Sequence, residues 1–373
     1  MTARHDVVAK IRLDHLRRNL RAMRRLVAPA GIIGVVKANA YGHGDVRVAK
    51  TLEAEGVSML AVAPVEEAVE LREEGVKAPI LVMARVWDDQ LPLITRYDLQ
   101  PVVASEEDYT RFAAFADRAN QPIRVHLKLD TGMGRLGLLY DRYEQVLQSI
   151  LQHSRLELAG VMSHFATADL VDDLAVTQAE RFSAIVQQVS EEVKEERPVY
   201  HLANSSAALY MSGVNYDLVR LGLSLYGVAP SERREAPVTL HPVLSLKSRV
   251  AYVKHFPEGF PIGYGSTYHT RRDSTIAICA GGYEDGIPRS YGNTGQVLIH
   301  GKRFPIVGNV SMDTFMVDVG TAPVASGDEV VVLGAQGEDR ITAWEMADKL
   351  RVIPYEILCG ISPRVAREYV DTE

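Results

Sequence analysis

The stretch Val36-Lys37-Ala38-Asn39-Ala40-Tyr41-Gly42-His43-Gly44 ends an apolar run that begins at Gly31. The run predicts a buried strand over 31–36, with Lys37 at its carboxyl end and a glycine-bracketed turn leading into the next helix. An amine held in such a partly apolar place loses its proton more readily than one in water, which makes it a usable nucleophile toward a carbonyl. The plainer interpretation is a strand that ends on a solvated lysine, and the strand by itself favours that interpretation.

The first two-thirds of the chain alternate short apolar runs with amphipathic, charged stretches, which is typical of repeated βα units. The predicted strands are Gly31–Val36, Met59–Ala63, Ile80–Met83, Pro101–Val103, Arg124–Leu129, Glu157–Met162, Tyr200–Leu202 and Leu218–Leu221. The segments between them predict helices, among them Val65–Glu74 and Thr177–Glu196. Such repeats predict an α/β fold, a (β/α)8 TIM-type barrel over residues 12–236. An open doubly wound sheet is the alternative, but no glycine fingerprint with a downstream acid supports it.

After Pro237 the helical periodicity disappears and alternating runs lie between turn residues, which predicts a mostly β C-terminal domain over 237–373. The predicted strands there are Val243–Val253, Thr275–Ala280, Gln296–Ile299, Phe315–Val319 and Glu329–Leu333. Residues 1–11 are expected to add a strand to this domain. A short helix is predicted over Thr342–Leu350, with Thr342 as its cap and Glu345 three residues later.

The composition of the 373 residues is that of an ordinary globular protein, with 47% hydrophobic and 24% charged residues. The net charge of −7 argues against nucleic-acid and anionic-membrane partners. The two cysteines, Cys279 and Cys359, imply neither a disulfide framework nor a metal site. No apolar run reaches the length of a membrane span, and the N-terminus lacks a hydrophobic signal core. We therefore expect a cytoplasmic enzyme.

Chemistry in a βα barrel takes place at the carboxyl ends of the strands and in the loops that follow them. The predicted strands place at that rim Lys37, Lys128, Asp130, Arg135, His164, Asn204, Ser205, Arg220 and Gly222. Independent charged residues would not collect on one rim, so this clustering predicts an active site there.

The loops after the last two barrel strands are the usual phosphate site of such barrels. Asn204-Ser205-Ser206 and Leu221-Gly222-Leu223-Ser224 offer hydroxyl and backbone N–H groups in those loops. Asn-Ser-Ser alone is more typical of a helix cap. Combined with a lysine able to form a Schiff base, the two loops indicate pyridoxal 5'-phosphate (PLP).

Further motifs extend over essentially the whole chain in a fixed order: Val36–Gly44, His126–Gly137, Met162–Phe165, Ala203–Ser205, Val219–Gly222, Gly263–Gly265, Gly282–Gly286, Ser311–Asp313 and Pro354–Glu356. Together they resemble the motifs of the alanine racemases, PLP enzymes built as a barrel plus a β domain. The resemblance implies two-base racemisation that interconverts L-alanine and D-alanine and supplies D-alanine for peptidoglycan. It also implies a head-to-tail homodimer whose β domain completes the active site of the partner subunit.

The resemblance further implies individual roles. Lys37 carries PLP and serves as the base on one face of the substrate, and Tyr264 of the partner subunit serves the other face. The cofactor is bound by Tyr41, Arg135, His164, Asn204, Ser205, Arg220, Gly222, Leu223 and Tyr355. Among these, Arg220 faces the pyridine nitrogen. Arg135 and the backbone N–H of Met312 bind the substrate carboxylate, and Tyr283 lies at the entrance.

Several of these residues also have plainer interpretations. Lys128 resembles a family lysine that is carbamylated and orients Arg135, or it is an ordinary cation beside Asp130. Tyr264 alone is typical of a packed β-turn aromatic, and Met312 alone of a core side chain.

One position departs from the family pattern. Asn309 stands where an arginine is common, lining the entry corridor opposite an aspartate that matches Asp169, and this leaves Arg289 as the charged partner.

Other functions are weighed on the same residues. A racemase for serine or for several amino acids is not separated from an alanine racemase by the sequence. A PLP-dependent decarboxylase of the same layout would need a cysteine–acid pair and a glycine-rich phosphate stretch, and neither is found; Cys359 is expected to be a buried structural thiol. A non-catalytic PLP carrier on a lone barrel is disfavoured by the residues after Pro237.

Overall fold

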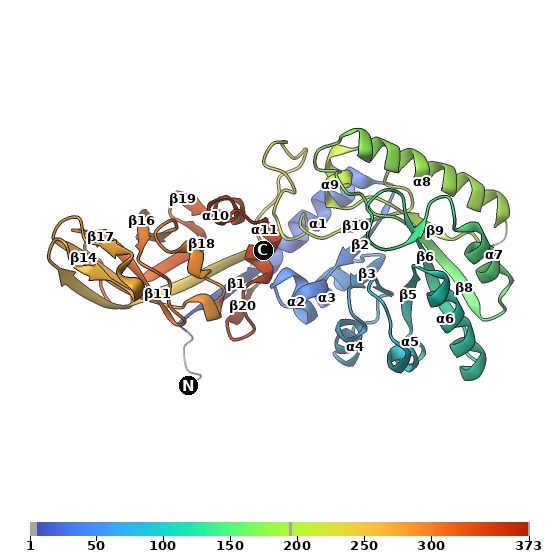
Figure 1. Cartoon of the computed structure of the whole chain (residues 1–373), viewed down its shortest axis with the longest axis horizontal. Helices are drawn as coiled ribbons and strands as arrows, with labels where there is room; N and C mark the ends of the chain where they lie inside the picture. Colours follow the sequence, from blue (N-terminus) through green and yellow to red (C-terminus); the bar gives the residue numbers. More distant parts are fainter. Residues whose placement is uncertain (1–5, 194–195, 372–373) are drawn as a thin grey trace. The chain divides into compact units, whose positions relative to one another are not determined.

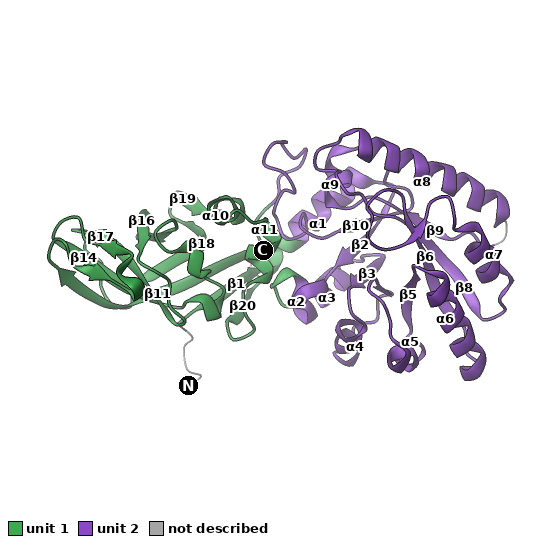
Figure 2. Ribbon diagram, viewed as in Figure 1, with its two compact units in different colours: residues 1–16, 41–44, 241–373 green, residues 17–40, 45–240 purple. Residues whose placement is uncertain are grey.

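The computed structural model describes residues 6–193 and 196–371, which divide into two compact units (Figure 2). Unit 2, called here the barrel unit, comprises residues 17–40 and 45–240. Unit 1, the β unit, comprises residues 1–16, 41–44 and 241–373. The short segment Tyr41–Gly44 therefore belongs to the β unit although it lies within the barrel part of the sequence, and the sequence did not suggest this.

The barrel unit is built on eight parallel strands in the order β10-β2-β3-β4-β5-β6-β8-β9. Their bounds are β2 (Gly31–Val35), β3 (Met59–Val62), β4 (Ile80–Val82), β5 (Leu99–Val103), β6 (Ile123–Asp130), β8 (Leu156–Met162), β9 (Val199–His201) and β10 (Leu218–Leu221). The N–H of Asp217 donates to the carbonyl of Tyr200 at 3.0 Å and that of Arg220 to Ala203 at 2.9 Å, so the seam between β9 and β10 is nearly closed. The predicted barrel is confirmed.

The strands carry continuous apolar runs because both of their faces are covered. Every residue of β3 and β4 is buried, as expected of parallel strands with side chains packed inside and helices outside. The helices are α1 (Leu13–Val27), α3 (Asp45–Ala54), α4 (Val65–Glu73), α5 (Leu91–Arg96), α6 (Glu106–Ala119), α7 (Glu144–Gln152), α8 (Asp173–Glu192) and α9 (Ser205–Tyr210), with a 3-10 turn η1 (Asp88–Gln90). Figure 1 shows α4 to α8 along the outside of the strands.

Two details of this unit differ from the sequence prediction. Helix α8 begins at Asp173 rather than Thr177, because the Asp172 side chain caps it by accepting the N–H of Ala175 at 2.9 Å. It ends at Glu192, and residues 194–195 of the predicted extension lie outside the described residues. A short strand β7 (Leu138–Leu139), which was not predicted, pairs with β6.

The β unit contains a nine-stranded sheet in the order β19-β18-β15-β16-β17-β14-β11-β1-β20, in which β18 also pairs with β11. The strand bounds are β1 (Val8–Arg12), β11 (Leu244–Phe256), β14 (Ser274–Ala280), β15 (Gln296–Ile299), β16 (Lys302–Val307), β17 (Thr314–Gly320), β18 (Glu329–Gln336), β19 (Asp339–Ile341) and β20 (Ala366–Val370), beside a small hairpin of β12 (Pro261–Ile262) and β13 (Tyr268–His269). The strand expected from the N-terminal residues is confirmed: β1 runs antiparallel to β11 and parallel to β20.

The remaining elements of the β unit are short. They are α10 (Ala343–Leu350), α11 (Pro354–Cys359) and the 3-10 turns η2 (Tyr264–Ser266), η3 (Tyr283–Asp285) and η4 (Arg289–Tyr291). The predicted cap of α10 is confirmed, because the Thr342 hydroxyl accepts the N–H of Glu345 at 3.0 Å. The prediction for Cys359 is wrong: its thiol is exposed, since α11 buries Pro354, Ile357 and Leu358 on its other face.

Among the described helices, none combines the length and the apolar character needed to cross a membrane.

Candidate active site

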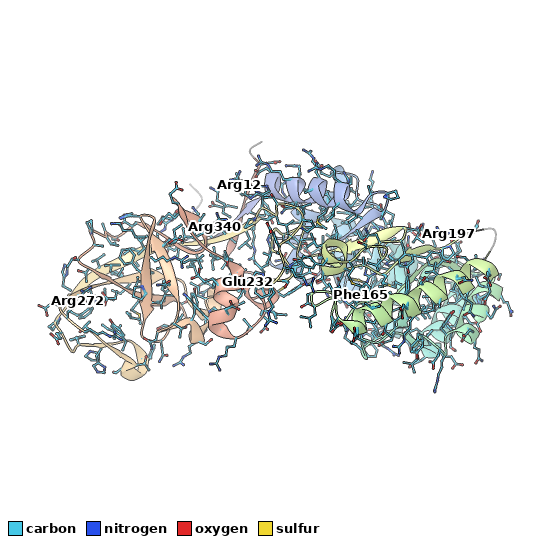
Figure 3. All side chains as sticks on the ribbon, turned by 90° about the horizontal axis from the view of Figure 1, so that it is seen from above. Arg12, Phe165, Arg197, Glu232, Arg272 and Arg340 are labelled. Atoms are coloured by element: carbon cyan, nitrogen blue, oxygen red, sulfur yellow. The ribbon has the colours of Figure 1, made fainter. Side chains whose placement is uncertain are left out.

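The predicted polar residues of the barrel unit lie at the carboxyl ends of its strands. Lys37 follows β2, and the loop between β6 and β7 carries Arg135. His164 follows β8, directly before the buried Phe165 that is labelled in Figure 3. Asn204 and Ser205 follow β9, and Arg220 lies in β10 with Gly222 just beyond its end.

Arg220 is the most extensively hydrogen-bonded of these side chains. Its guanidinium is 3% exposed, and its bonds use only Nη1 and Nη2. Nη1 donates to the carbonyl of His201 at 2.7 Å and to its Nδ1 at 3.0 Å. Nη2 donates to the carbonyls of Ser163 (2.5 Å) and Leu202 (3.0 Å) and to Nδ1 of His164 (3.1 Å). Burial lowers the pKa of Arg220 to about 9, which still leaves it protonated at neutral pH.

Two buried histidines next to Arg220 were not predicted as site residues. His201 contacts Arg220 directly, and His126 contacts His201 with 2.9 Å between Nδ1 and Nε2. Burial lowers the pKa of His126 to about 3 and that of His201 well below its usual value, with the charge of Arg220 acting in the same direction. Strand alternation was the available signal: His126 lies two residues before Lys128 on β6 and therefore points the same way.

The negative charge of Asp130 acts on the Lys128 amine and opposes the lowering of its pKa, while the oxygens of the carboxylate are hydrogen-bonded to the backbone. The Asp130 carboxylate accepts the backbone N–H groups of Gly132, Met133 and Arg135 at 2.8–2.9 Å, and so it holds the turn that carries Arg135. Lys128 is 6% exposed. Burial, assisted by the charges of Arg220 and Arg135, lowers the pKa of the Lys128 amine from 10.5 to about 7.

A small cluster of donors follows β9 and β10. The Ser205 hydroxyl accepts the N–H of Gly222 at 3.0 Å, the N–H of Ser224 at 3.4 Å and the Ser224 hydroxyl at 3.0 Å. The Ser205 oxygen accepts all three of these bonds, so the hydrogen of its own hydroxyl is the donor that it can offer to a phosphate group. Asn204 is the cap of α9, as its plainer interpretation holds, because its side-chain oxygen accepts the N–H of Ala207 at 3.0 Å.

The residues after Lys37 form a left-handed turn, labelled α2 (Lys37–Tyr41). Ala38, Asn39 and Ala40 have φ of 51–54° and ψ of 46–52°, and Tyr41 has φ of 53°. Each such residue costs about 1–2 kcal/mol for an L-amino acid. Side chains hold the turn: Glu67 accepts the N–H of Ala38 at 2.7 Å, and the Asn39 oxygen accepts the N–H of Asp45 at 3.0 Å.

Tyr41 and Tyr355 lie together within the β unit, with ring centroids 5.7 Å apart. Tyr41 is 6% exposed, and burial raises the pKa of its phenol. Tyr41 therefore stays protonated at neutral pH.

The three remaining predicted residues are exposed on the β unit: Tyr264 is 73%, Met312 50% and Tyr283 43% exposed. The plainer interpretations of Tyr264 as a packed aromatic and of Met312 as a core residue are therefore wrong. Both lie in turns between strands, where no strand face covers them.

The backbone that carries these exposed side chains is nevertheless firmly held by the loop 308–313. The Asn309 amide donates to the carbonyl of Tyr264 at 2.8 Å, a contact that the sequence did not suggest. The N–H of Tyr283 donates to the carbonyl of Ser311 at 3.0 Å.

Arg364 also fixes these loops. Its guanidinium binds both carboxylate oxygens of Asp285, at 2.8 and 2.7 Å, and Asp313 at 2.7 Å. The turns that present Tyr264, Tyr283 and Met312 are thus linked through side chains that were not predicted as site residues.

Comparison with known proteins agrees with this architecture. Residues 11–230 match the family model for the alanine racemase N-terminal domain, and residues 243–369 match that for the C-terminal domain. The chain is 43% identical to the alanine racemase of Carboxydothermus hydrogenoformans over 98% of this chain and 99% of that protein.

Solved structures agree as well. The alanine racemase of Bacillus anthracis with bound L-Ala-P has a TM-score of 0.93 and 35% identity, covering 99% of this chain and 96% of that one. The alanine racemase of Bartonella henselae with covalently bound pyridoxal phosphate has a TM-score of 0.89 and 28% identity, covering 98% and 100%. The chain belongs to the alanine racemase family.

Proposed function

We propose that the protein interconverts L-alanine and D-alanine with PLP as cofactor, using Lys37 and Tyr264 as its two bases. The observation that carries the proposal is the position of Lys37 at the end of β2, on the rim of a family barrel that also presents Arg220 and the donors around Ser205.

The residues of the chain fit PLP by their chemistry. Lys37 would supply the amine that binds covalently to the aldehyde carbon of PLP. The Ser205 hydroxyl and the backbone of Gly222 and Leu223 would hold the phosphate, and the family resemblance assigns the phenols of Tyr41 and Tyr355 to the same group. When bound, the cofactor supplies an electron sink that stabilises the carbanion formed at Cα of alanine.

Arg220 would determine how strongly the ring of the bound cofactor accepts electrons. Its Nη1 and Nη2 are bonded to protein acceptors, so Nε–H is the donor that would be left for the pyridine nitrogen of the bound cofactor. A guanidinium that keeps its own proton does not pass one to the ring. The ring is then a weaker electron acceptor, which favours return of the proton to Cα over side reactions such as transamination.

Racemisation needs an acid–base group on each face of the planar carbanion. Lys37 serves one face, and Tyr264 of a second subunit serves the other in a head-to-tail homodimer. The exposure of Tyr264 supports this role, because a phenol packed into its own chain would not reach another subunit. Arg135 and the N–H of Met312 bind the alanine carboxylate, and Tyr283 lies at the entrance.

Lys128 is the residue that orients Arg135. Burial lowers the pKa of the Lys128 amine and so favours its neutral form, and a neutral amine adds to CO2, forming an N–C bond and releasing one proton. The resulting carbamate carries a negative charge toward the guanidinium of Arg135.

The function is tested by incubating L-alanine, L-serine and L-lysine with the PLP-loaded protein and measuring both enantiomers by chiral chromatography. We expect alanine to be racemised, Lys37→Ala to abolish the reaction, and borohydride to fix the cofactor to Lys37. Lys50→Ala, which removes an exposed lysine of α3 paired with Glu74, is the control and should leave the rate unchanged. A borohydride label on Lys128, or preference for serine over alanine, would contradict the assignment.

The carbamate is tested by ¹³C NMR in ¹³C-bicarbonate. We expect a carbamate resonance that grows as the pH rises through about 7, because burial holds the pKa of Lys128 there and only the neutral amine reacts. Lys128→Ala should remove the resonance and Lys50→Ala should keep it. A resonance that appears only near pH 10 would show an exposed amine instead.

Sharing of the site between subunits is tested by complementation. Lys37→Ala and Tyr264→Phe homodimers should each be inactive, and mixed dimers should recover part of the activity, because one of their two sites then holds both intact bases. Mass spectrometry of the mixture establishes that subunits have exchanged. Exchange without recovery would mean that each chain forms its site alone.

The direction of proton transfer is tested by deuterium wash-in for each enantiomer. Tyr264→Phe should lose α-proton exchange from L-alanine by ~10²–10⁴-fold, the usual effect of removing a general base, and much less from D-alanine. Tyr252→Phe alters another exposed tyrosine of the β unit (65% exposed) and should leave both rates unchanged. Equal loss for both enantiomers would assign Tyr264 a role in shaping the pocket only.

A further inference from the structure

A row of buried polar side chains crosses the inside of the barrel and ends on Arg220. It consists of Gln100 on β5, His126 on β6 and His201 on β9, which are 4%, 0% and 0% exposed. Gln100 Oε1 lies 2.9 Å from His126 Nε2, His126 Nδ1 lies 2.9 Å from His201 Nε2, and His201 Nδ1 lies 3.0 Å from Arg220 Nη1. The row therefore connects four strands of the barrel.

The hydrogen bonds of this row have only one possible direction. A guanidinium has donors and no acceptor, so His201 Nδ1 must accept from Arg220. His201 then carries its proton on Nε2 and donates to His126 Nδ1. His126 in turn carries its proton on Nε2 and donates to the carbonyl oxygen of Gln100. One arginine thus fixes the tautomers of two histidines and the orientation of one amide.

The barrel provides space for this row. Gly160 of β8 pairs with His126 of β6, and a Cβ at position 160 would collide with the His126 ring. The His126 and His201 rings meet edge to face, with centroids 5.1 Å apart and an interplanar angle of 76°.

Both histidines are neutral in this setting. Burial, together with the charge of Arg220, holds the pKa of each well below its ordinary value. An imidazolium at either position would also place a donor opposite another donor, which breaks the row.

We propose that Gln100, His126 and His201 form a one-directional positioning chain that holds Arg220 by Nη1 and thereby aims its Nε–H at the pyridine nitrogen of PLP. The proposal rests on the proposed function for its catalytic consequence. The direction of these hydrogen bonds does not depend on the proposed function, because Arg220 imposes it whether or not PLP is bound. Gln100 and His126 are linked to Arg220 through His201, so the three act as positioning residues through Arg220.

The direction is tested by NMR of the full-length protein labelled with [15N]histidine, with and without PLP. Both His126 and His201 should be neutral with the proton on Nε2 and with hydrogen-bonded Hε2 resonances. A proton on Nδ1 of His201, or an imidazolium at either position, would overturn the proposal. This result stands whether or not the protein racemises alanine, so it is separate from the test of the proposed function.

The consequence for Arg220 is tested with two replacements of nearly equal size at position 100. Gln100→Met removes the oxygen acceptor, and Gln100→Glu keeps one. In Gln100→Met the His126 Hε2 resonance should move upfield, and kcat for racemisation should fall about tenfold, the equivalent of one buried hydrogen bond. The KM for alanine should change by less than about twofold, because the chain does not contact substrate. Gln100→Glu should retain the wild-type tautomers and kcat.

Asn19→Leu is the matched control. Asn19, like Gln100, is a buried amide of the barrel unit. Its Nδ2 donates to the carbonyl of Leu225 at 3.0 Å, and neither Asn19 nor Leu225 belongs to the positioning chain. It should lower stability without changing the histidine resonances or kcat. Equal losses of kcat in Asn19→Leu and Gln100→Met would show a general packing effect and overturn the positioning role, as would a Gln100→Glu variant no better than Gln100→Met. If Gln100→Met does not fold, the wild-type tautomers still decide the direction.

Discussion

A positive charge buried inside the barrel constrains the structure around it. Arg220 is bonded to the carbonyls of Ser163, His201 and Leu202 and to two imidazole nitrogens. A buried guanidinium requires an acceptor for nearly every N–H, because an unpaired buried donor costs about 1–3 kcal/mol or more. Its acceptors come from the carboxyl ends of β8 and β9, while the arginine itself belongs to β10. The bonds that satisfy the charge thus also fix the strand ends at the seam where the barrel closes.

The β unit differs from the barrel unit in that three of its predicted site residues are exposed. Tyr264, Tyr283 and Met312 are exposed, yet their turns are joined through loop 308–313 and fixed by the double ion pair of Arg364. Ordering exposed residues in advance lowers the conformational entropy lost when another surface meets them. The sequence motifs in these turns therefore combine exposed side chains with glycines and carboxylates that shape the backbone beneath them.

The barrel could be predicted because its strands have two covered faces and hence continuous apolar runs such as Met59–Val62. Strand β16 could not, because Pro305 argues against a strand and the pairing with β15 overrides it. Rim residues such as Lys37 followed from strand ends, whereas His126 and His201 resemble ordinary buried histidines until their partners are known. Two details could not be predicted from the sequence. The helix cap at Asp172 depends on one side-chain contact, and the exposure of Cys359 depends on which face of its helix is buried.

The left-handed turn after Lys37 has a consequence for the chirality of the chain itself. At Ala38 and Ala40 the backbone has positive φ and ψ, the mirror image of the ordinary right-handed helical region. An L-residue there brings its Cβ close to the following carbonyl oxygen, while a residue of opposite configuration would be relaxed. In a protein whose family interconverts the two forms of alanine, two L-alanines close to Lys37 are held in the conformation natural to the D-form. The contacts from Glu67 and Asn39 are what impose it.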